Sequence, residues 1–85
     1  MFYTYLWLRE DGTPYYAGKG RGNRAFIRHS HRFPPPPNDR ILIQEFSTEM
    51  DALSAEKFLI SYYGREDEGT GSLLNLTDGG DVWFS

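Results

Sequence analysis

The sequence predicts a small α/β (α+β) domain in which a three-stranded antiparallel sheet is flanked by helices. Three observations lead to this prediction. Two runs rich in β-branched and aromatic residues lie on either side of Asp11-Gly12, as in a hairpin. A third run of this kind covers 40–46. A helical pattern with an apolar face covers 49–63 and ends before Gly64. Because the chain has 85 residues, we expect one domain over 1–85.

The expected hairpin covers 3–18 and brings tyrosines together. A two-residue loop with positive φ at Asp11-Gly12 puts three pairs opposite one another: Leu8 with Tyr15, Trp7 with Tyr16, and Tyr5 with Gly18. Tyr5 and Tyr16 then share a face as diagonal neighbours. A loop longer by one residue would reverse the parity and put Tyr15 beside Tyr5. Gly18 has no side chain, so it leaves room for something to approach the backbone.

A basic segment follows the hairpin. Asn23 is a good N-cap, so a helix is predicted from Arg24 to about Arg32. Pro34 to Pro37 then excludes both helix and sheet interior and predicts a stiff extended connector. At helical spacing, one face of the predicted helix carries a basic stripe: Arg24, Arg28, and His31 or Arg32.

The strand at 40–46 can pair with either hairpin strand. Ser47 or Thr48 can cap the second helix, and early acids suit its positive end. Glu56 falls within the apolar stripe of this helix, where an acid is costly unless it is paired or binds a cation. A salt bridge to an arginine and a position at the edge of the stripe are the structural explanations. Metal binding is the functional one. The apolar stripe itself consists of Ala52, Leu53, Leu59, Ile60 and Tyr63.

The charge distribution says more than the net charge of −3. The segment 19–32 carries five basic residues and no acid, whereas acids gather in the later half of the chain. Two solvated faces of opposite sign would explain this, and so would a nucleic-acid contact. The chain has no cysteine, which excludes disulfides and thiolate metal sites. Without an apolar run of roughly 20 residues or a visible signal peptide, we expect a cytoplasmic protein with no membrane partner.

Two triplets carry a resemblance to a known family. Tyr3-Thr4-Tyr5, followed by Tyr16-Ala17-Gly18, resembles the paired signature of the GIY-YIG nucleases, although the first two letters differ and Ala17 replaces Ile. The order of elements also resembles that family over nearly the whole chain. Matched position by position, the signature tyrosines and glycine, the helix arginine, the metal-holding glutamate and the late asparagine are Tyr5, Tyr16, Gly18, Arg24, Glu56 and Asn75.

The resemblance implies an endonuclease that hydrolyses DNA phosphodiester bonds with an activated water. It implies that Glu56 holds Mg²⁺, or another divalent metal such as Mn²⁺, and one carboxylate suffices because magnesium keeps several waters. Arg24 would grip the phosphate as a planar fork. One of Tyr5 and Tyr16 would take the proton from water, and our prediction favours Tyr5 as the base with Tyr16 orienting. Neighbouring phosphates and the substrate would contact Gly18, Lys19, Arg21, Arg28, His31 and Asn75.

The histidine position departs from the family pattern. In many members a histidine lies one helical turn after the arginine, where this chain has Arg28. His29 and His31 bracket that position, and either could serve; we assign the catalytic role to His29. Asn75 lies between leucines, and from sequence it is either a backbone hydrogen-bonder or a site residue.

Two other functions remain open. One is a module of the same fold that binds nucleic acid without cleaving it. The other is a small protein-interaction domain that uses its tyrosines and Pro34 to Pro37. The family usually joins the catalytic module to a DNA-binding domain, so a separate DNA-binding domain or protein, or a homo-oligomer, is expected as partner.

Overall fold

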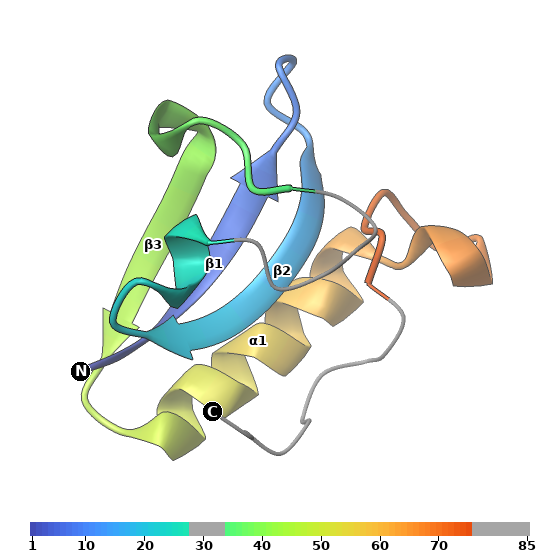
Figure 1. The fold of residues 1–85 in the computed structure, drawn as a ribbon. Helices are drawn as coiled ribbons and strands as arrows, with labels where there is room; N and C mark the ends of the chain where they lie inside the picture. The colour runs from blue at the N-terminus through green and yellow to red at the C-terminus, as the bar shows by residue number, and fades with distance from the viewer. Residues whose placement is uncertain (28–33, 76–85) are drawn as a thin grey trace.

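The chain forms a small α+β domain with one three-stranded antiparallel sheet and one α-helix (Figure 1). The computed structural model describes residues 1–27 and 34–75. The strand order is β2-β1-β3, so the N-terminal strand is central. The elements in chain order are β1 (Phe2–Leu8), β2 (Pro14–Arg21), the 3-10 turn η1 (Arg24–Phe26), the 3-10 turn η2 (Asn38–Arg40), β3 (Ile41–Phe46), α1 (Glu49–Tyr63) and the 3-10 turn η3 (Glu66–Glu68).

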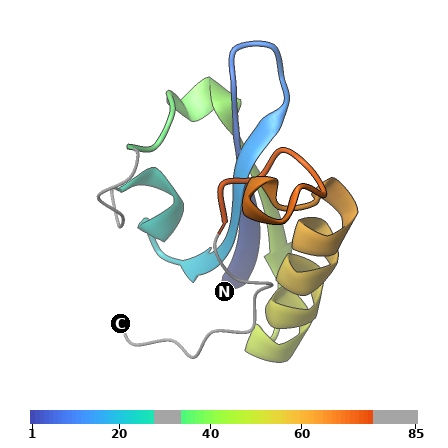
Figure 2. The same ribbon diagram turned by 90° about the vertical axis from the view of Figure 1, so that its right-hand side faces the viewer.

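The central strand is buried on both faces. Figure 2 shows α1 on one side of the sheet and η1 on the other. Because side chains alternate along a strand, β1 supplies two separate apolar clusters. The cluster on the side of η1 contains Tyr3, Tyr5, Trp7, Ala25 and Ile41, and Tyr15 and Tyr16 pack against it. The cluster on the side of α1 contains Leu6, Ala17, Ile60 and Leu73.

The hairpin loop is longer than the sequence predicted. Gly12 N–H bonds to Arg9 C=O at 2.9 Å and Arg9 N–H to Thr13 C=O at 2.8 Å. The loop therefore has three residues, and of these only Gly12 has positive φ. The prediction that Asp11 also has positive φ was wrong. Asp11 instead accepts hydrogen bonds from Thr13, at 2.9 Å from its N–H and 2.7 Å from its hydroxyl.

An irregularity in β2 restores the predicted register beyond the loop. Leu8 faces Pro14 and not Tyr15, and the register shifts between Trp7 and Leu8. Tyr15 is thus the extra residue of a β-bulge, which compensates for the longer loop. The predicted pairs of Trp7 with Tyr16 and of Tyr5 with Gly18 are confirmed. The alternative in which a longer loop puts Tyr15 beside Tyr5 is wrong, because Tyr16 keeps that place and the ring of Tyr15 packs against Trp7 at 6.1 Å between centroids.

The first predicted helix is wrong within the described residues. Only the three-residue turn η1 forms, and Ile27 is already extended, with φ −120° and ψ 155°. Asn23 makes no side-chain capping bond. The physical reason is that this segment has contiguous apolar residues and no helical stripe, so a longer helix would gain no buried face. Ala25 is the one buried residue of η1.

The third strand and the second helix match the sequence closely. β3 begins at Ile41 and pairs with β1. α1 covers the predicted range, and Thr48 caps it by accepting a hydrogen bond from Asp51 N–H at 3.1 Å. Gly64 ends the helix with φ 76°. Within residues 1–27 and 34–75, no helix combines the length and the apolar character needed to cross a membrane.

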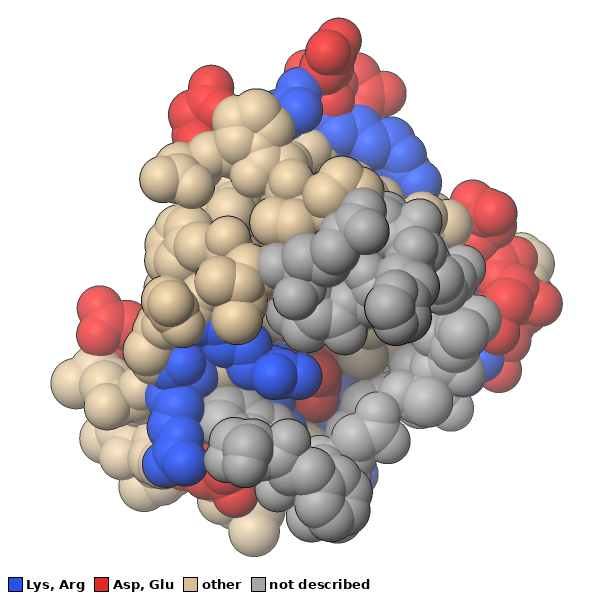
Figure 3. All heavy atoms as spheres, in the orientation of Figure 1, with Lys and Arg blue, Asp and Glu red and all other residues tan. Residues whose placement is uncertain are grey.

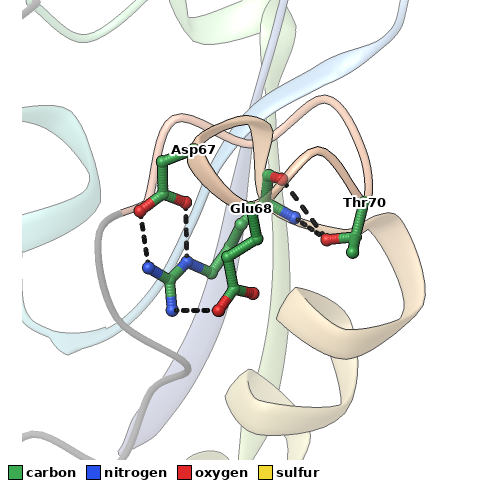
Figure 4. A network of polar contacts seen from close by, with 4 residues as sticks. Asp67, Glu68 and Thr70 are labelled. Carbon is green, nitrogen blue, oxygen red and sulfur yellow. Dashed lines mark hydrogen bonds and ion pairs between the residues drawn. The ribbon is translucent and has the colours of Figure 1, made fainter.

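The charged loop after α1 is held by an arginine. Arg65 Nε and Nη2 donate to the two carboxylate oxygens of Asp67 at 2.9 and 2.6 Å, and Nη1 lies 3.5 Å from Glu68 (Figure 4). Thr70 Oγ1 accepts from Arg65 N–H at 3.0 Å. These contacts fold the loop on itself and direct the chain to the outer edge of β2, where Leu74 N–H bonds to Tyr15 C=O at 2.7 Å.

Candidate active site

The site is built around the phenol of Tyr5, which leans from β1 across Gly18 of β2. The side chain of Tyr5 is 1% exposed. A Cβ at Gly18 would lie 2.6 Å from both Cζ and Oη of Tyr5, closer than real contacts allow. The room that Gly18 leaves is therefore filled by Tyr5 itself. The sequence predicted that Gly18 leaves room for something to approach the backbone, and in the structure Tyr5 does so.

Tyr16 lies beside Tyr5 on the same face, as the sequence predicted. Their ring centroids are 6.1 Å apart with an interplanar angle of 36°. Tyr16 also contacts Trp7, at 5.1 Å between centroids. Tyr16 is half-buried, whereas Tyr5 is sealed. The two signature tyrosines thus differ in their access to water.

Arg24 approaches this face from η1. A Cβ at Gly20 would lie 3.2 Å from Cβ of Arg24 and 3.0 Å from Cε1 of Tyr3, so Gly20 allows the turn to sit close to the sheet. Figure 3 shows basic side chains gathered on this face, with an acidic side chain recessed beside them.

The pKa of Tyr5 reports which charged groups surround it. Burial is the largest effect and raises the pKa of Tyr5 well above its ordinary value. A negative charge on Tyr16 raises it further. Arg24 lowers it, whereas Glu56 raises it, so both charges lie within electrostatic reach of the phenol. Tyr5 is thus reached by charges from both η1 and α1, which lie on opposite sides of the sheet.

Glu56 is half-buried on α1. Its charge raises the pKa of Tyr5, so it lies within electrostatic reach of that phenol. In the part of the chain that the structure describes, no group of three or more His, Asp or Glu side chains converges to hold a metal ion. A single carboxylate nevertheless suits magnesium, which binds through one or two carboxylates and keeps water on its other positions. The carboxylate of Glu56 therefore fits the way in which magnesium binds to proteins.

Lys19 and Arg21 occupy different places. Lys19 pairs with Thr4 and is 6% exposed, so it alternates away from the tyrosine face. Arg21 is exposed at the end of β2, next to the turn that leads to Arg24. The two predicted contact residues thus differ, because Arg21 lies on the surface and Lys19 is buried within the fold.

The side chain of Asn75 bonds to the backbone of β2, far away in sequence. Its Oδ1 accepts from Ala17 N–H at 3.0 Å, and its Nδ2 donates to Ala17 C=O at 2.7 Å. Asn75 is 6% exposed and Ala17 is fully buried. Of the two explanations from sequence, backbone hydrogen bonding is present, but its partner is distant in sequence. The side-chain amide pairs with Ala17 on the outer edge of β2 in the way that the backbone of a neighbouring strand would.

Three predicted residues, Arg28, His29 and His31, lie outside the described residues. Sequence reasoning also missed two residues that bear on the site. Tyr3 and Trp7 bond to the backbone around Arg24. Their spacing could have predicted this, because Tyr3 and Trp7 lie two residues before and after Tyr5 in β1, and period-two spacing puts all three side chains on one face.

Comparison of the chain with models of protein families, with curated proteins and with solved structures finds no match.

Proposed function

We propose that this protein is a metal-dependent endonuclease of the GIY-YIG type, which hydrolyses DNA phosphodiester bonds with an activated water. One observation carries the proposal. Tyr16, Arg24 and Glu56 each lie within electrostatic reach of the buried phenol of Tyr5, so three of the residues matched by the sequence resemblance gather around the fourth. The β2-β1-β3 sheet with its glycine-lined second strand supports the same reading.

The different environments of Tyr5 and Tyr16 suit them to different roles in the proposed reaction. A base must lose its proton near the working pH, and the raised pKa of Tyr5 opposes that role. We therefore assign proton acceptance to Tyr16, which is half-buried, in place of the Tyr5 assignment made from sequence. A charge on Tyr16 raises the pKa of Tyr5 further, so a Tyr16 that had given up its proton would keep Tyr5 protonated. Tyr5 supports the ring of Tyr16 at 6.1 Å.

Arg24 and Glu56 supply the charges that phosphoryl hydrolysis needs. The guanidinium of Arg24 would grip two phosphate oxygens and offset the charge that builds in the transition state. Glu56 would hold the divalent ion, which supplies further positive charge to the phosphate when bound. The exposed Arg21 would contact the next phosphate without reading sequence.

The test is nicking of supercoiled plasmid with and without magnesium. Wild type, Glu56→Gln and Glu49→Gln are compared; Glu49 is an exposed glutamate of the same helix. We expect magnesium-dependent nicking by wild type and Glu49→Gln, and its loss in Glu56→Gln. Nicking that survives in Glu56→Gln would contradict the metal assignment. No nicking by folded wild type, with either magnesium or manganese, would contradict the enzyme.

A second candidate is a DNA-binding module that has lost catalysis. The burial of Tyr5 and its raised pKa favour it, since one of the two matched tyrosines is hard to ionise. Fluorescence anisotropy with a labelled duplex separates the two candidates: binding that weakens with salt, without cleavage in magnesium, would favour the module.

A further inference from the structure

The backbone of Ala25 is held at both of its polar groups by aromatic side chains of β1. Tyr3 Oη accepts a hydrogen bond from Ala25 N–H at 3.0 Å and donates to Gly22 C=O at 2.9 Å. Trp7 Nε1 donates to Ala25 C=O at 2.9 Å. Ala25 and Trp7 are fully buried, and Tyr3 is 6% exposed. These three bonds connect the central strand to the turn that bears Arg24.

The turn has little stability of its own. It contains three residues, and one of its two internal bonds, from Ile27 N–H to Arg24 C=O, is long at 3.5 Å. Asn23 does not cap it. A single 3-10 turn with such bonds does not persist without tertiary contacts. The bonds from Tyr3 and Trp7 therefore set where the turn lies on the sheet.

From these contacts we infer that Tyr3 and Trp7 are positioning residues for Arg24. Arg24 directly precedes Ala25, so fixing both polar groups of Ala25 fixes the Cα–Cβ direction of Arg24 above Gly20. The Tyr3 hydroxyl restrains the turn more than Trp7 does, because it accepts from Ala25 N–H within the turn and donates to Gly22 C=O before it. The inference rests on the proposed function only in the statement that Arg24 binds phosphate.

The decisive variant is Tyr3→Phe, which removes one oxygen and keeps the ring in the core. Tyr62→Phe is the matched control, because Tyr62 is 70% exposed on α1. Trp7→Phe is less informative by itself, since it also removes buried volume. Tyr3→Phe leaves Ala25 N–H and Gly22 C=O without their partner, whereas the strands and α1 keep all their bonds.

The first readout is nuclear magnetic resonance of the folded protein and needs no activity. In Tyr3→Phe we expect the Ala25 amide to exchange with solvent about three- to tenfold faster, as the loss of one hydrogen bond predicts. The Arg24 Nε–H group should lose order, whereas the amides of α1 should not change. Unchanged exchange at Ala25 and unchanged order at Arg24 would overturn the inference, even if the protein proves to be a nuclease.

The second readout is a double-mutant cycle with Arg24→Ala on plasmid nicking. If Tyr3 acts through Arg24, Tyr3→Phe slows nicking in the wild-type background by about three- to tenfold and has no further effect in Arg24→Ala. An equal effect in both backgrounds would mean a purely structural Tyr3 and would overturn the inference. If wild type does not nick, the proposed function fails, and the resonance data still decide whether Tyr3 positions Arg24.

Discussion

Replacing Asn75 tests whether the last described residue holds the fold together. In Asn75→Ala, Ala17 N–H loses its acceptor at 3.0 Å and Ala17 C=O loses its donor at 2.7 Å. Both groups belong to a fully buried residue of β2. Leu74 N–H, which bonds to Tyr15 C=O at 2.7 Å, would remain as the neighbouring contact along this edge.

The expected loss follows from these two unpaired groups. Each buried backbone group left without a partner costs about 1–2 kcal/mol in free energy of unfolding, so Asn75→Ala should lose about 2–4 kcal/mol. For a domain of this size, 1 kcal/mol shifts the melting temperature by about 4–8 °C, so we expect a fall of about 8–32 °C. Urea unfolding, followed by tryptophan fluorescence, measures the free energy directly.

The control is Asn38→Ala, an exposed asparagine in η2. It makes the same chemical change and should alter the free energy of unfolding by less than about 0.5 kcal/mol. The reasoning fails if Asn75→Ala unfolds at the same urea concentration as Asn38→Ala. If Asn75→Ala keeps its stability but no longer nicks plasmid, Asn75 has a role in the active site and not in stabilising the fold.

Three further predictions concern the sheet, the helix cap and alkaline pH. Gly18→Ala should lower the free energy of unfolding by about 1–3 kcal/mol in urea, because the new Cβ meets the Tyr5 phenol at 2.6 Å. Gly12→Ala would be a poor control because Gly12 has positive φ, so the variant is compared with wild type, and equal stability would contradict the clash. Thr48→Ala should cost about 1 kcal/mol through loss of the bond from Asp51 N–H, and Thr48→Ser should retain most of it; equal losses would contradict the cap. Because burial raises the pKa of Tyr5, its contribution to stability is complete below the unfolded value of about 10 and is lost as pH rises above it. Tyr5→Phe should therefore weaken the fall in melting temperature between about pH 9 and 11, and an unchanged slope would refute this.

The hairpin shows which part of a strand register can be predicted from sequence. The pairs that include Tyr5 and Trp7 were predicted correctly because a buried face demands a fixed parity. The loop was wrong because Asp11 bonds to Thr13 and does not adopt positive φ. The bulge at Tyr15 restores the parity. Local turn signals cannot reveal such a compensation, because it depends on which side chains the core accepts.

The helix predicted to begin at Arg24 was wrong within the described residues for a related reason. A cap and basic residues at helical spacing are local signals, and nothing in them says whether the segment has a face to bury. α1 was predicted to the residue because its cap, apolar stripe and terminal Gly64 all agree. The segment at 24–27 is fixed instead by bonds from Tyr3 and Trp7, which lie far away in sequence. No pattern within the segment contains that information.

The two signature tyrosines explain why their roles could not be assigned from sequence. Both triplets present the same residue type, and the motif alone treats them as equivalent. The structure separates them through Gly18, which lets Tyr5 lie flat across β2 and lose contact with water. Tyr16 has Trp7 as its cross-strand neighbour and stays half-buried. Burial raises the pKa of Tyr5, so the glycine of the second triplet, by making room for this ring, helps to make the tyrosine of the first triplet hard to ionise.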